Sequence, residues 1–174
     1  MNNSVKRNVS TALEPALMPT AEPAQQLDHS SHAGHPMQAM DASVDDVAGA
    51  EDVLKAYRTA LEARDADAMS ALFAESSAIF ENGKAEGSFA NYMEHHLGPE
   101  LHAIKSFTFS DPTLTVTRMG HMAYGYETYG YRIELEDGRV FERDGVATSV
   151  LSHDASGWNI VQYHSSSRAP RTRK

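Results

Sequence analysis

Cysteine is absent from the 174-residue sequence, which excludes a disulfide framework, a thiolate metal site and a cysteine nucleophile. No apolar run approaches the roughly 20 residues that a membrane-spanning helix needs, so we expect no membrane partner. Positive charge is scarce, because 15 Lys and Arg stand against 24 Asp and Glu and give a net charge of −9. This balance argues against a nucleic-acid partner, since affinity for phosphate backbones depends on clustered cations.

What the sequence does contain is one stretch typical of a folded domain, flanked by two that are not. Apolar residues make up 41% of the chain, and 174 residues leave room for one domain with a sizeable core. We predict a disordered leader at 1–46, a folded domain at 47–168 and a basic tail at 169–174.

The leader begins like a degenerate secretory signal. Lys6 and Arg7 precede a stretch that ends in small residues, but Glu14, Glu22 and three prolines interrupt its apolar part. A relic of an export signal would place the protein in the periplasm. A plain disordered leader would leave it in the cytoplasm, and the sequence leaves both alternatives open.

Farther along the leader, histidines recur every three residues and two methionines follow. Imidazole and thioether groups suit copper, and a flexible segment can wrap such an ion without a preformed cage. The copper ligands predicted here are His29, His32, His35, Met37 and Met40. The alternative is a solvated linker that happens to be rich in histidine.

From Val47 the pattern becomes helical. Apolar residues recur at i, i+3, i+4 and i+7 as far as Leu61, with charged residues opposite, which predicts an amphipathic helix buried on one side. A shorter helix is predicted within 65–73, with Asp65 or Asp67 as its cap. A third follows Ser88, and Gly98-Pro99 is expected to kink or end it.

Strand signals occupy the rest of the chain. A brief strand ends in an Asn82-Gly83 turn, and Asp137-Gly138 joins two longer strands as a hairpin. The strand-like runs after the third helix are 106–111, 113–118, 122–135, 139–151 and 158–166. Helices followed by such a meander predict an α+β fold, in which a strongly curved, mostly antiparallel sheet wraps as a cone around three N-terminal helices.

This order of elements resembles the nuclear transport factor 2-like fold, which includes ketosteroid isomerase, scytalone dehydratase and the SnoaL-like polyketide cyclases. The segment GWNIVQYHSSSRAP is similar to the closing strand of the association domain of calcium/calmodulin-dependent protein kinase II and its bacterial relatives. Trp158, Val161, His164, Ser166 and Pro170 match the pattern Trp-x-x-Val-x-x-His-x-Ser-x-x-x-Pro of that strand. The resemblance covers about residues 47 to 170 and implies a fold more than a function.

The resemblance also implies what the interior of the cone holds. The kinase association domain carries cavity arginines on the two strands before the last, but the matching positions here fall near Tyr126 and Ser149, so no carboxylate-binding arginine pocket is expected. Ketosteroid isomerase and the cyclases place an acidic base inside the cone, a role open here to Glu127 or Asp144. Strict alternation turns either Tyr126 or Glu127 inward and leaves open which.

His164 is a candidate for chemistry in the last strand. With a period of two it shares a face with Trp158, Ile160 and Gln162, so a concave Trp158 would place His164 at the mouth of a cavity. There it would serve as a base, a ligand contact or a metal donor. The alternative is a buried histidine tied to a neighbouring carbonyl.

The third helix offers a second candidate. Tyr92 and His96 share a face, and only one of the adjacent His95 and His96 can point squarely inward. If the helix continues beyond Pro99, His96 and Glu100 are neighbours, and with His164 they would form a two-His-one-carboxylate metal set. The alternatives are an acid–base pocket without a metal and histidines that only pack.

We therefore predict a small-ligand or metal-binding protein, with no cofactor indicated beyond a divalent metal or copper. The ligand contacts predicted are Tyr57, Tyr92, His96, Tyr126 and His164. One alternative is a lyase, isomerase or cyclase that acts on a small hydrophobic substrate, with His96, His164 or Glu127 as the catalytic candidates. Another is a homo-oligomeric assembly domain, which would form a large stable oligomer. Otherwise we expect a homodimer through the outer face of the sheet.

Overall fold

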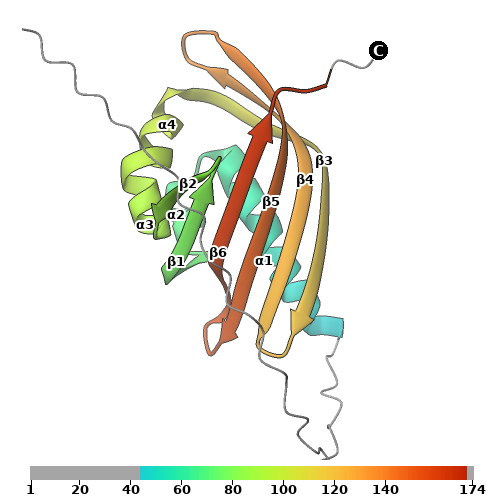
Figure 1. Ribbon diagram of the computed structural model, residues 1–174. Helices are drawn as coiled ribbons and strands as arrows, with labels where there is room; N and C mark the ends of the chain where they lie inside the picture. Colours follow the sequence, from blue (N-terminus) through green and yellow to red (C-terminus); the bar gives the residue numbers. More distant parts are fainter. Residues whose placement is uncertain (1–43, 172–174) are drawn as a thin grey trace, which may run out of the picture. The chain divides into compact units, whose positions relative to one another are not determined.

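The computed structural model describes residues 44–171, which form a six-stranded sheet with helices packed against it (Figure 1). The elements are α1 (Val44–Ala63), α2 (Ala66–Ser70), β1 (Phe73–Glu81), β2 (Lys84–Gly87), α3 (Phe89–Tyr92), η1 (Met93–Leu97), α4 (Gly98–Ala103), β3 (Ile104–Met119), β4 (Met122–Leu135), β5 (Val140–Asp154) and β6 (Gly157–Arg168). The strand order is β2-β1-β6-β5-β4-β3. Only β1 and β6 pair in parallel among these strands, so the predicted α+β fold with a mostly antiparallel sheet is confirmed.

Helix α1 packs against one face of the sheet, and Figure 1 shows the long strands curving past it. We call this face concave and the opposite face convex. The predicted helical spacing is seen in the buried Ala50, Leu54, Tyr57 and Ala60. A Cβ atom on Gly125 of β4 would lie 2.8 Å from Cδ1 of Leu54, so glycine at this position lets α1 approach the sheet closely.

Two turns and one bulge shape the sheet. Asn82 and Gly83 have φ of 48° and 87°, as a two-residue type I′ hairpin requires, and they join β1 to a strand, β2, that the sequence did not predict. The runs predicted at 106–111 and 113–118 form one strand, β3. The register shifts between Ser110 and Thr113, where Pro112 has no N–H to donate to the ladder.

The helical segment 89–103 runs through α3, η1 and α4 without a break. Ser88 caps it as predicted, since its hydroxyl accepts a 3.2 Å hydrogen bond from the Asn91 N–H. The helix does not end at Gly98-Pro99, because it widens there into a π-turn in which the Gly98 N–H donates to the Met93 carbonyl. None of the helices within residues 44–171 is long and apolar enough to cross a membrane.

Aromatic rings join α1, the helical segment and the sheet into one core. Phe73 of β1 stacks on Phe89 of α3 with ring centroids 3.9 Å apart. Tyr57 of α1 meets Phe73 edge-on at 5.1 Å and Tyr163 of β6 edge-on at 5.1 Å. Tyr57 and Tyr163 also line the cavity described below, so the packed core and the cavity wall share residues.

Candidate functional site

A cavity of about 270 Å³ opens between the helical segment 89–103, α1 and the concave face of the sheet. Its aromatic lining consists of Tyr57, Tyr92, Phe107, Phe109, Tyr129, Tyr131 and Tyr163. Its polar lining includes Glu81, His96, Glu100, Arg143, Ser165 and Ser167. An apolar pocket with a few converging polar groups is the usual form of a small-molecule site.

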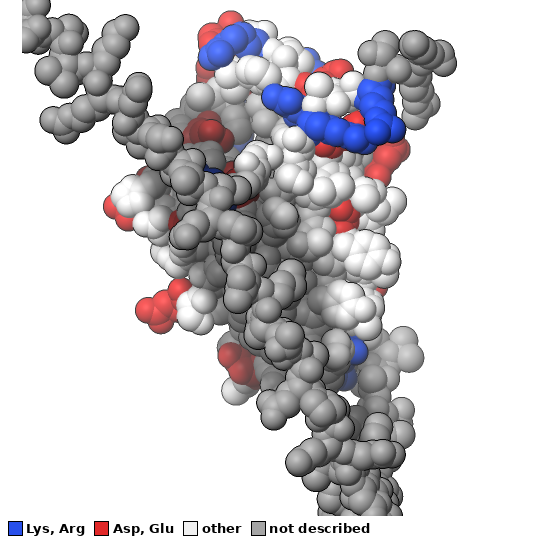
Figure 2. All heavy atoms as spheres, in the orientation of Figure 1, with Lys and Arg blue, Asp and Glu red and all other residues white. Residues whose placement is uncertain are grey.

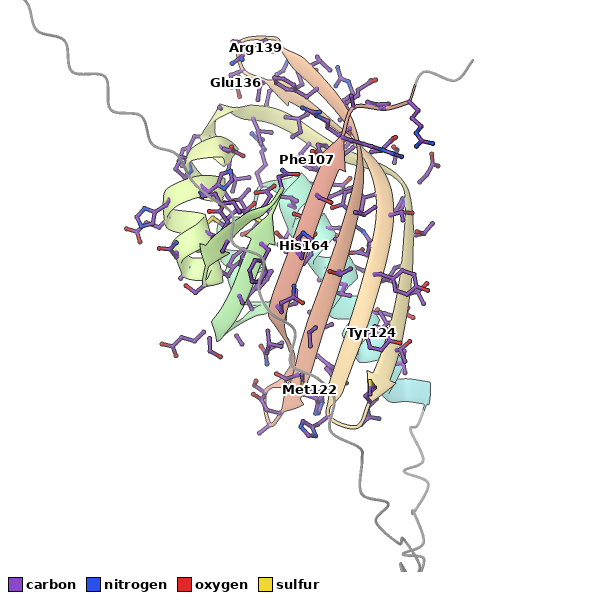
Figure 3. All side chains as sticks on the ribbon, in the orientation of Figure 1. Phe107, Met122, Tyr124, Glu136, Arg139 and His164 are labelled. Atoms are coloured by element: carbon purple, nitrogen blue, oxygen red, sulfur yellow. The ribbon has the colours of Figure 1, made fainter. Side chains whose placement is uncertain are left out.

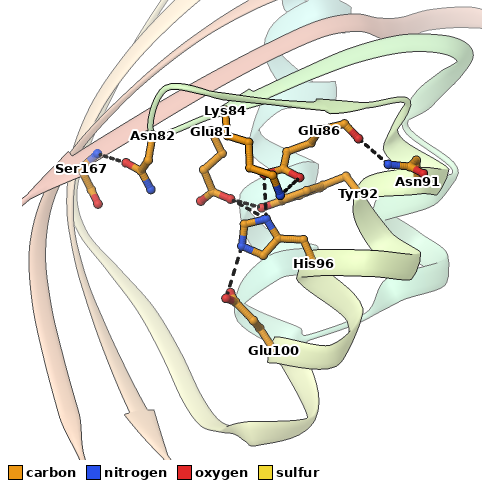
Figure 4. A network of polar contacts seen from close by, with 9 residues as sticks. All are labelled: Glu81, Asn82, Lys84, Glu86, Asn91, Tyr92, His96, Glu100 and Ser167. Atoms are coloured by element: carbon orange, nitrogen blue, oxygen red, sulfur yellow. Dashed lines mark hydrogen bonds and ion pairs between the residues drawn. The ribbon is translucent and has the colours of Figure 1, made fainter. Parts of the chain in front are cut away.

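His96 is held at the helical wall of the cavity by a buried carboxylate (Figure 4). Its Nδ1 lies 3.0 Å from Oε1 of Glu86, whose side chain is 4% exposed. The other oxygen of Glu86 accepts a 2.8 Å hydrogen bond from Nζ of Lys84. The hydrogen bonds from Lys84 and then from His96 hold the pKa of Glu86 below its ordinary value. An ionised Glu86 requires a proton on Nδ1, which leaves Nε2 of His96 for other partners.

Two more carboxylates lie close to this histidine. Oε2 of Glu81 accepts a 2.8 Å hydrogen bond from the Tyr92 hydroxyl and lies 3.7 Å from Nδ1 of His96. Oε1 of Glu100 lies 3.3 Å from Nε2 of His96, on a side chain that is 61% exposed. His95 is turned to solvent, so His96 is the member of the adjacent pair that faces the cavity.

The tyrosines in the wall are held in their neutral form. Burial is the first cause of a raised pKa at Tyr57, Tyr92, Tyr129 and Tyr163. At Tyr92 the neighbouring Tyr57 and Glu81 raise the pKa of the phenol further. The Tyr92 hydroxyl already donates its proton to Glu81, and a neutral hydroxyl whose proton is not so used is a hydrogen-bond donor rather than an anion.

Serines and one arginine form a second polar group in the cavity. Oδ1 of Asn82 accepts a 3.0 Å hydrogen bond from the Ser167 N–H, and the Asn82 N–H donates to the Ser165 carbonyl at 3.0 Å. The Tyr131 hydroxyl donates to Oγ of Ser167 at 2.9 Å. The β1–β2 turn thus fixes the end of β6, and Arg143 of β5 completes this part of the lining.

Of the alternatives Tyr126 and Glu127, the structure turns Glu127 to the concave side. Glu127 is 2% exposed and forms an ion pair with Arg58 of α1. It is not part of the cavity lining, and its Oε2 has no hydrogen-bond partner among the described residues. Glu127 therefore joins α1 to β4, and the other candidate acid, Asp144, lies near Arg168 at 4.0 Å.

The prediction that His164 faces the cavity is wrong. Leu151 pairs with Ile160 and Val150 pairs with Gln162, so β6 has one extra residue, Val161, at a bulge. One extra residue reverses the alternation beyond it. His164 is exposed on the convex face beside Phe80, at 6.5 Å between ring centroids (Figure 3).

Tyr126, which was predicted as a ligand contact, does not line the cavity. Tyr126 is 51% exposed on the convex face, opposite Thr148 of β5. The predicted cavity contacts Tyr57, Tyr92 and His96 do line the cavity together.

The predicted metal set is not assembled. His96 and Glu100 are neighbours, but His164 is on the other face of the sheet. Within residues 44–171, no group of three or more His, Asp and Glu side chains is placed to hold a metal ion. The leader residues predicted to bind copper lie outside the described residues.

Three residues of the site were missed by the sequence reasoning. Glu81 and Glu86 sit on the β1–β2 hairpin, which the Asn82-Gly83 signal would have revealed had a second strand been paired across it. Arg143 was missed because the pairing of β5 with β4 was not assigned from the sequence. In the structure Arg143 pairs with Tyr131 of β4, and both residues line the cavity.

Several solved structures are similar to this fold. A candidate ketosteroid isomerase from Shewanella frigidimarina is 26% identical, with a TM-score of 0.59, over 67% of this chain and 94% of that chain. A candidate dehydratase of the NTF2-like family from Streptomyces avermitilis is 18% identical, with a TM-score of 0.63, over 72% of this chain and 99% of that chain. An NTF2-like superfamily protein from Salmonella enterica is 16% identical, with a TM-score of 0.64, over 76% and 96% of the two chains.

No curated protein matches this chain significantly. The model of one protein family, the SnoaL-like domain, matches residues 50–170. This range includes all six strands and the whole helical wall of the cavity. The chain therefore belongs to the SnoaL-like domain family and has the nuclear transport factor 2-like fold.

Proposed function

We propose that this protein binds a small ring-containing molecule in the cavity and moves a proton on it, as a lyase or isomerase does. The observation that carries the proposal is the contact between His96 and the buried Glu86, 3.0 Å from Nδ1 to Oε1, at the wall of an aromatic cavity. A carboxylate behind a histidine fixes its tautomer and stabilises the imidazolium ion.

The residues suggest how the proton moves. In the neutral ring Nδ1–H donates to Glu86, and Nε2 accepts a proton from a substrate carbon next to a carbonyl, which leaves an enolate. In the protonated ring both nitrogens donate, to Glu86 and to Glu100, until the proton returns to another atom of the substrate. Tyr57 also lines the cavity, and its neutral hydroxyl is available to hold the enolate oxygen.

The names of the structural neighbours support this class of reaction. The Shewanella protein is named as a candidate ketosteroid isomerase and the Streptomyces protein as a candidate dehydratase. Both reactions include the removal of a proton from carbon. The fold by itself hosts many functions, so the His96 site carries the argument.

Hydrogen–deuterium exchange tests the proposal without a known substrate. We expect the protein in D₂O to accelerate exchange of the carbon-bound protons of small aryl ketones such as phenylacetone, followed by proton NMR. His96→Gln should lower the rate by about 10²- to 10⁴-fold, the usual contribution of a general base. His95→Gln is the matched control and should leave the rate unchanged. An unchanged rate in His96→Gln would reject His96 as the base.

We also propose that two copies of the chain meet through the convex face. The exposed apolar side chains there include Phe80, Tyr124, Tyr126 and Val146, which are 40–51% exposed. The convex positions of β4 from 122 to 128, of β5 from 146 to 152 and of β6 from 162 to 166 carry no charged residue. Figure 2 shows mostly uncharged surface over the middle of β4, with a group of Lys and Arg atoms near the upper end of the sheet.

A further inference from the structure

Arg143 is a cation without a partner in the wall of the cavity. It is half-buried on β5, where its Cα partner is Tyr131 of β4. Within residues 44–171, no hydrogen bond or ion pair involves the side chain of Arg143. By contrast, Arg132 on the neighbouring strand pairs with Glu134 at 3.2 Å. A partly desolvated guanidinium gains most from a planar anion that accepts two of its hydrogen bonds.

The acids of the cavity do not supply that anion. Glu81 bonds to Tyr92 and Glu100 lies beside His96, and neither forms an ion pair with Arg143 among the described residues. The acids of the cavity lie beside His96 and Tyr92, and none of them pairs with Arg143. A ligand in the cavity can therefore contact both a histidine and an unpaired arginine.

The hydroxyl of Ser167 adds a hydrogen-bond donor near Arg143, since Ser167 pairs with Gly145, two residues farther along β5. Oγ of Ser167 already accepts a hydrogen bond from the Tyr131 hydroxyl at 2.9 Å, so its own O–H is left to donate. Phe107 stacks on Tyr131 with ring centroids 5.4 Å apart, which gives a flat apolar wall next to these donors (Figure 3). Together these groups suit a carboxylate attached to a ring or a short apolar chain.

We propose that the ligand of this cavity is a small organic acid whose carboxylate binds Arg143 and Ser167. The reacting end of that acid points toward His96, and this part rests on the function proposed above. The resemblance to the kinase association domain predicts no carboxylate-binding arginine pocket, because the positions that carry arginine in that domain fall near Tyr126 and Ser149 here. Arg143 supplies the group from another position on β5.

Charge and size select a carboxylate over a phosphate ester. The lining contains one arginine, which can pair with one negative charge, and two glutamates, which repel a second negative charge on the same ligand. The volume of about 270 Å³ lies at the lower end of ordinary ligand pockets, which favours a ligand smaller than a nucleotide or a steroid conjugate.

The test compares three probes of one shape class by isothermal titration calorimetry. The probes are phenylacetate, its uncharged isostere 2-phenylacetamide, and phenyl phosphate. We expect wild-type protein to bind phenylacetate about 10- to 100-fold more tightly than the amide, as charge-assisted hydrogen bonds predict. Phenyl phosphate should bind less tightly than phenylacetate.

Variants then test whether Arg143 causes the preference for the acid over the amide. Arg143→Gln should abolish the preference for the acid, and Arg143→Lys should keep only part of it because lysine cannot bind bidentately. Arg132→Gln is the matched control on the next strand and should behave as wild type. Equal binding of acid and amide by wild-type protein, tighter binding of phenyl phosphate, or an undiminished preference in Arg143→Gln would each overturn the proposal.

These experiments can reject the proposed acid-binding site and the proposed proton-transfer reaction independently of each other. His96→Gln removes the proposed base but leaves Arg143 in place, so it should retain the preference for phenylacetate. A preference that survives in His96→Gln without any proton exchange in wild-type protein would support the acid site and reject the reaction. Loss of the preference for phenylacetate in His96→Gln would contradict the proposal that Arg143 binds the carboxylate independently of His96.

Discussion

At the scale of single residues, Glu86 explains why a histidine on a half-exposed helix has a defined orientation. The Glu86 side chain is 4% exposed, and both of its carboxylate oxygens are bonded, one to His96 and one to Lys84. A buried carboxylate is tolerable only with such partners. Lys84 therefore acts through Glu86 and positions the ring without touching the cavity lining.

Glu86 also predicts how stability depends on pH. Its pKa in the folded protein is lowered from 4.5, first by the hydrogen bond from Lys84, so its contribution is present above the unfolded pKa and is lost as pH falls through the folded one. The free energy of unfolding should therefore exceed that of Glu86→Gln at neutral pH. The excess should narrow steadily below about pH 4.5 in urea titrations of both proteins.

Lys84→Met provides the control for this pH dependence. It removes the first cause of the lowered pKa, so its pH dependence should shift toward that of Glu86→Gln while the His96 contact remains. A difference between wild type and Glu86→Gln that stays constant from neutral pH to pH 3 would contradict the assignment.

At the scale of elements, the helical segment 89–103 shows why His96 and Glu100 meet. The π-turn of η1 lets the helix pass Gly98-Pro99, so the i, i+4 pair of His96 and Glu100 forms across a proline. A Cβ on Gly98 would overlap the Met93 carbonyl oxygen that its own N–H bonds. Glycine is therefore required by the turn, although its φ is that of an ordinary helix.

Gly98→Ala should reverse the usual effect of this substitution. In an ordinary helix alanine is more stable than glycine by about 1 kcal/mol, but here the methyl group has no space and we expect a loss of about 1–3 kcal/mol. Ala90→Gly, at an exposed site of α3, should follow the ordinary rule and cost about 1 kcal/mol. Urea unfolding measures both, and a stabilised Gly98→Ala would disprove the crowding.

The same elements show what sequence patterns can and cannot predict here. The α1 face, the Ser88 cap and both Gly-containing hairpin turns follow from local rules, and the structure confirms them. The position of His164 does not, since the bulge at Val161 is set by pairing with β5 and reverses the faces of the last residues. Glu86 escaped prediction because β2, the strand that carries it, is only four residues long.

At the scale of the whole molecule, net charge and surface pattern bear on assembly. A charge of −9 makes identical copies repel each other over most of their surface. At the uncharged convex positions of β4, β5 and β6, two copies would approach without that cost, as the proposed dimer requires. Exposed tyrosine and valine side chains on the same face supply apolar area to bury.

Charge placed on this face should therefore separate the copies. We expect wild-type protein to sediment as a dimer and Tyr126→Glu with Val146→Glu to sediment as a monomer, because the C₂ contact brings each new carboxylate near its own copy. Ala71→Glu, an exposed position before β1, adds the same charge elsewhere and should leave the dimer intact. The cavity lining contains neither Tyr126 nor Val146, so the monomer should still bind phenylacetate through Arg143. A wild-type monomer, or a dimer that survives both substitutions, would place the interface elsewhere or remove it.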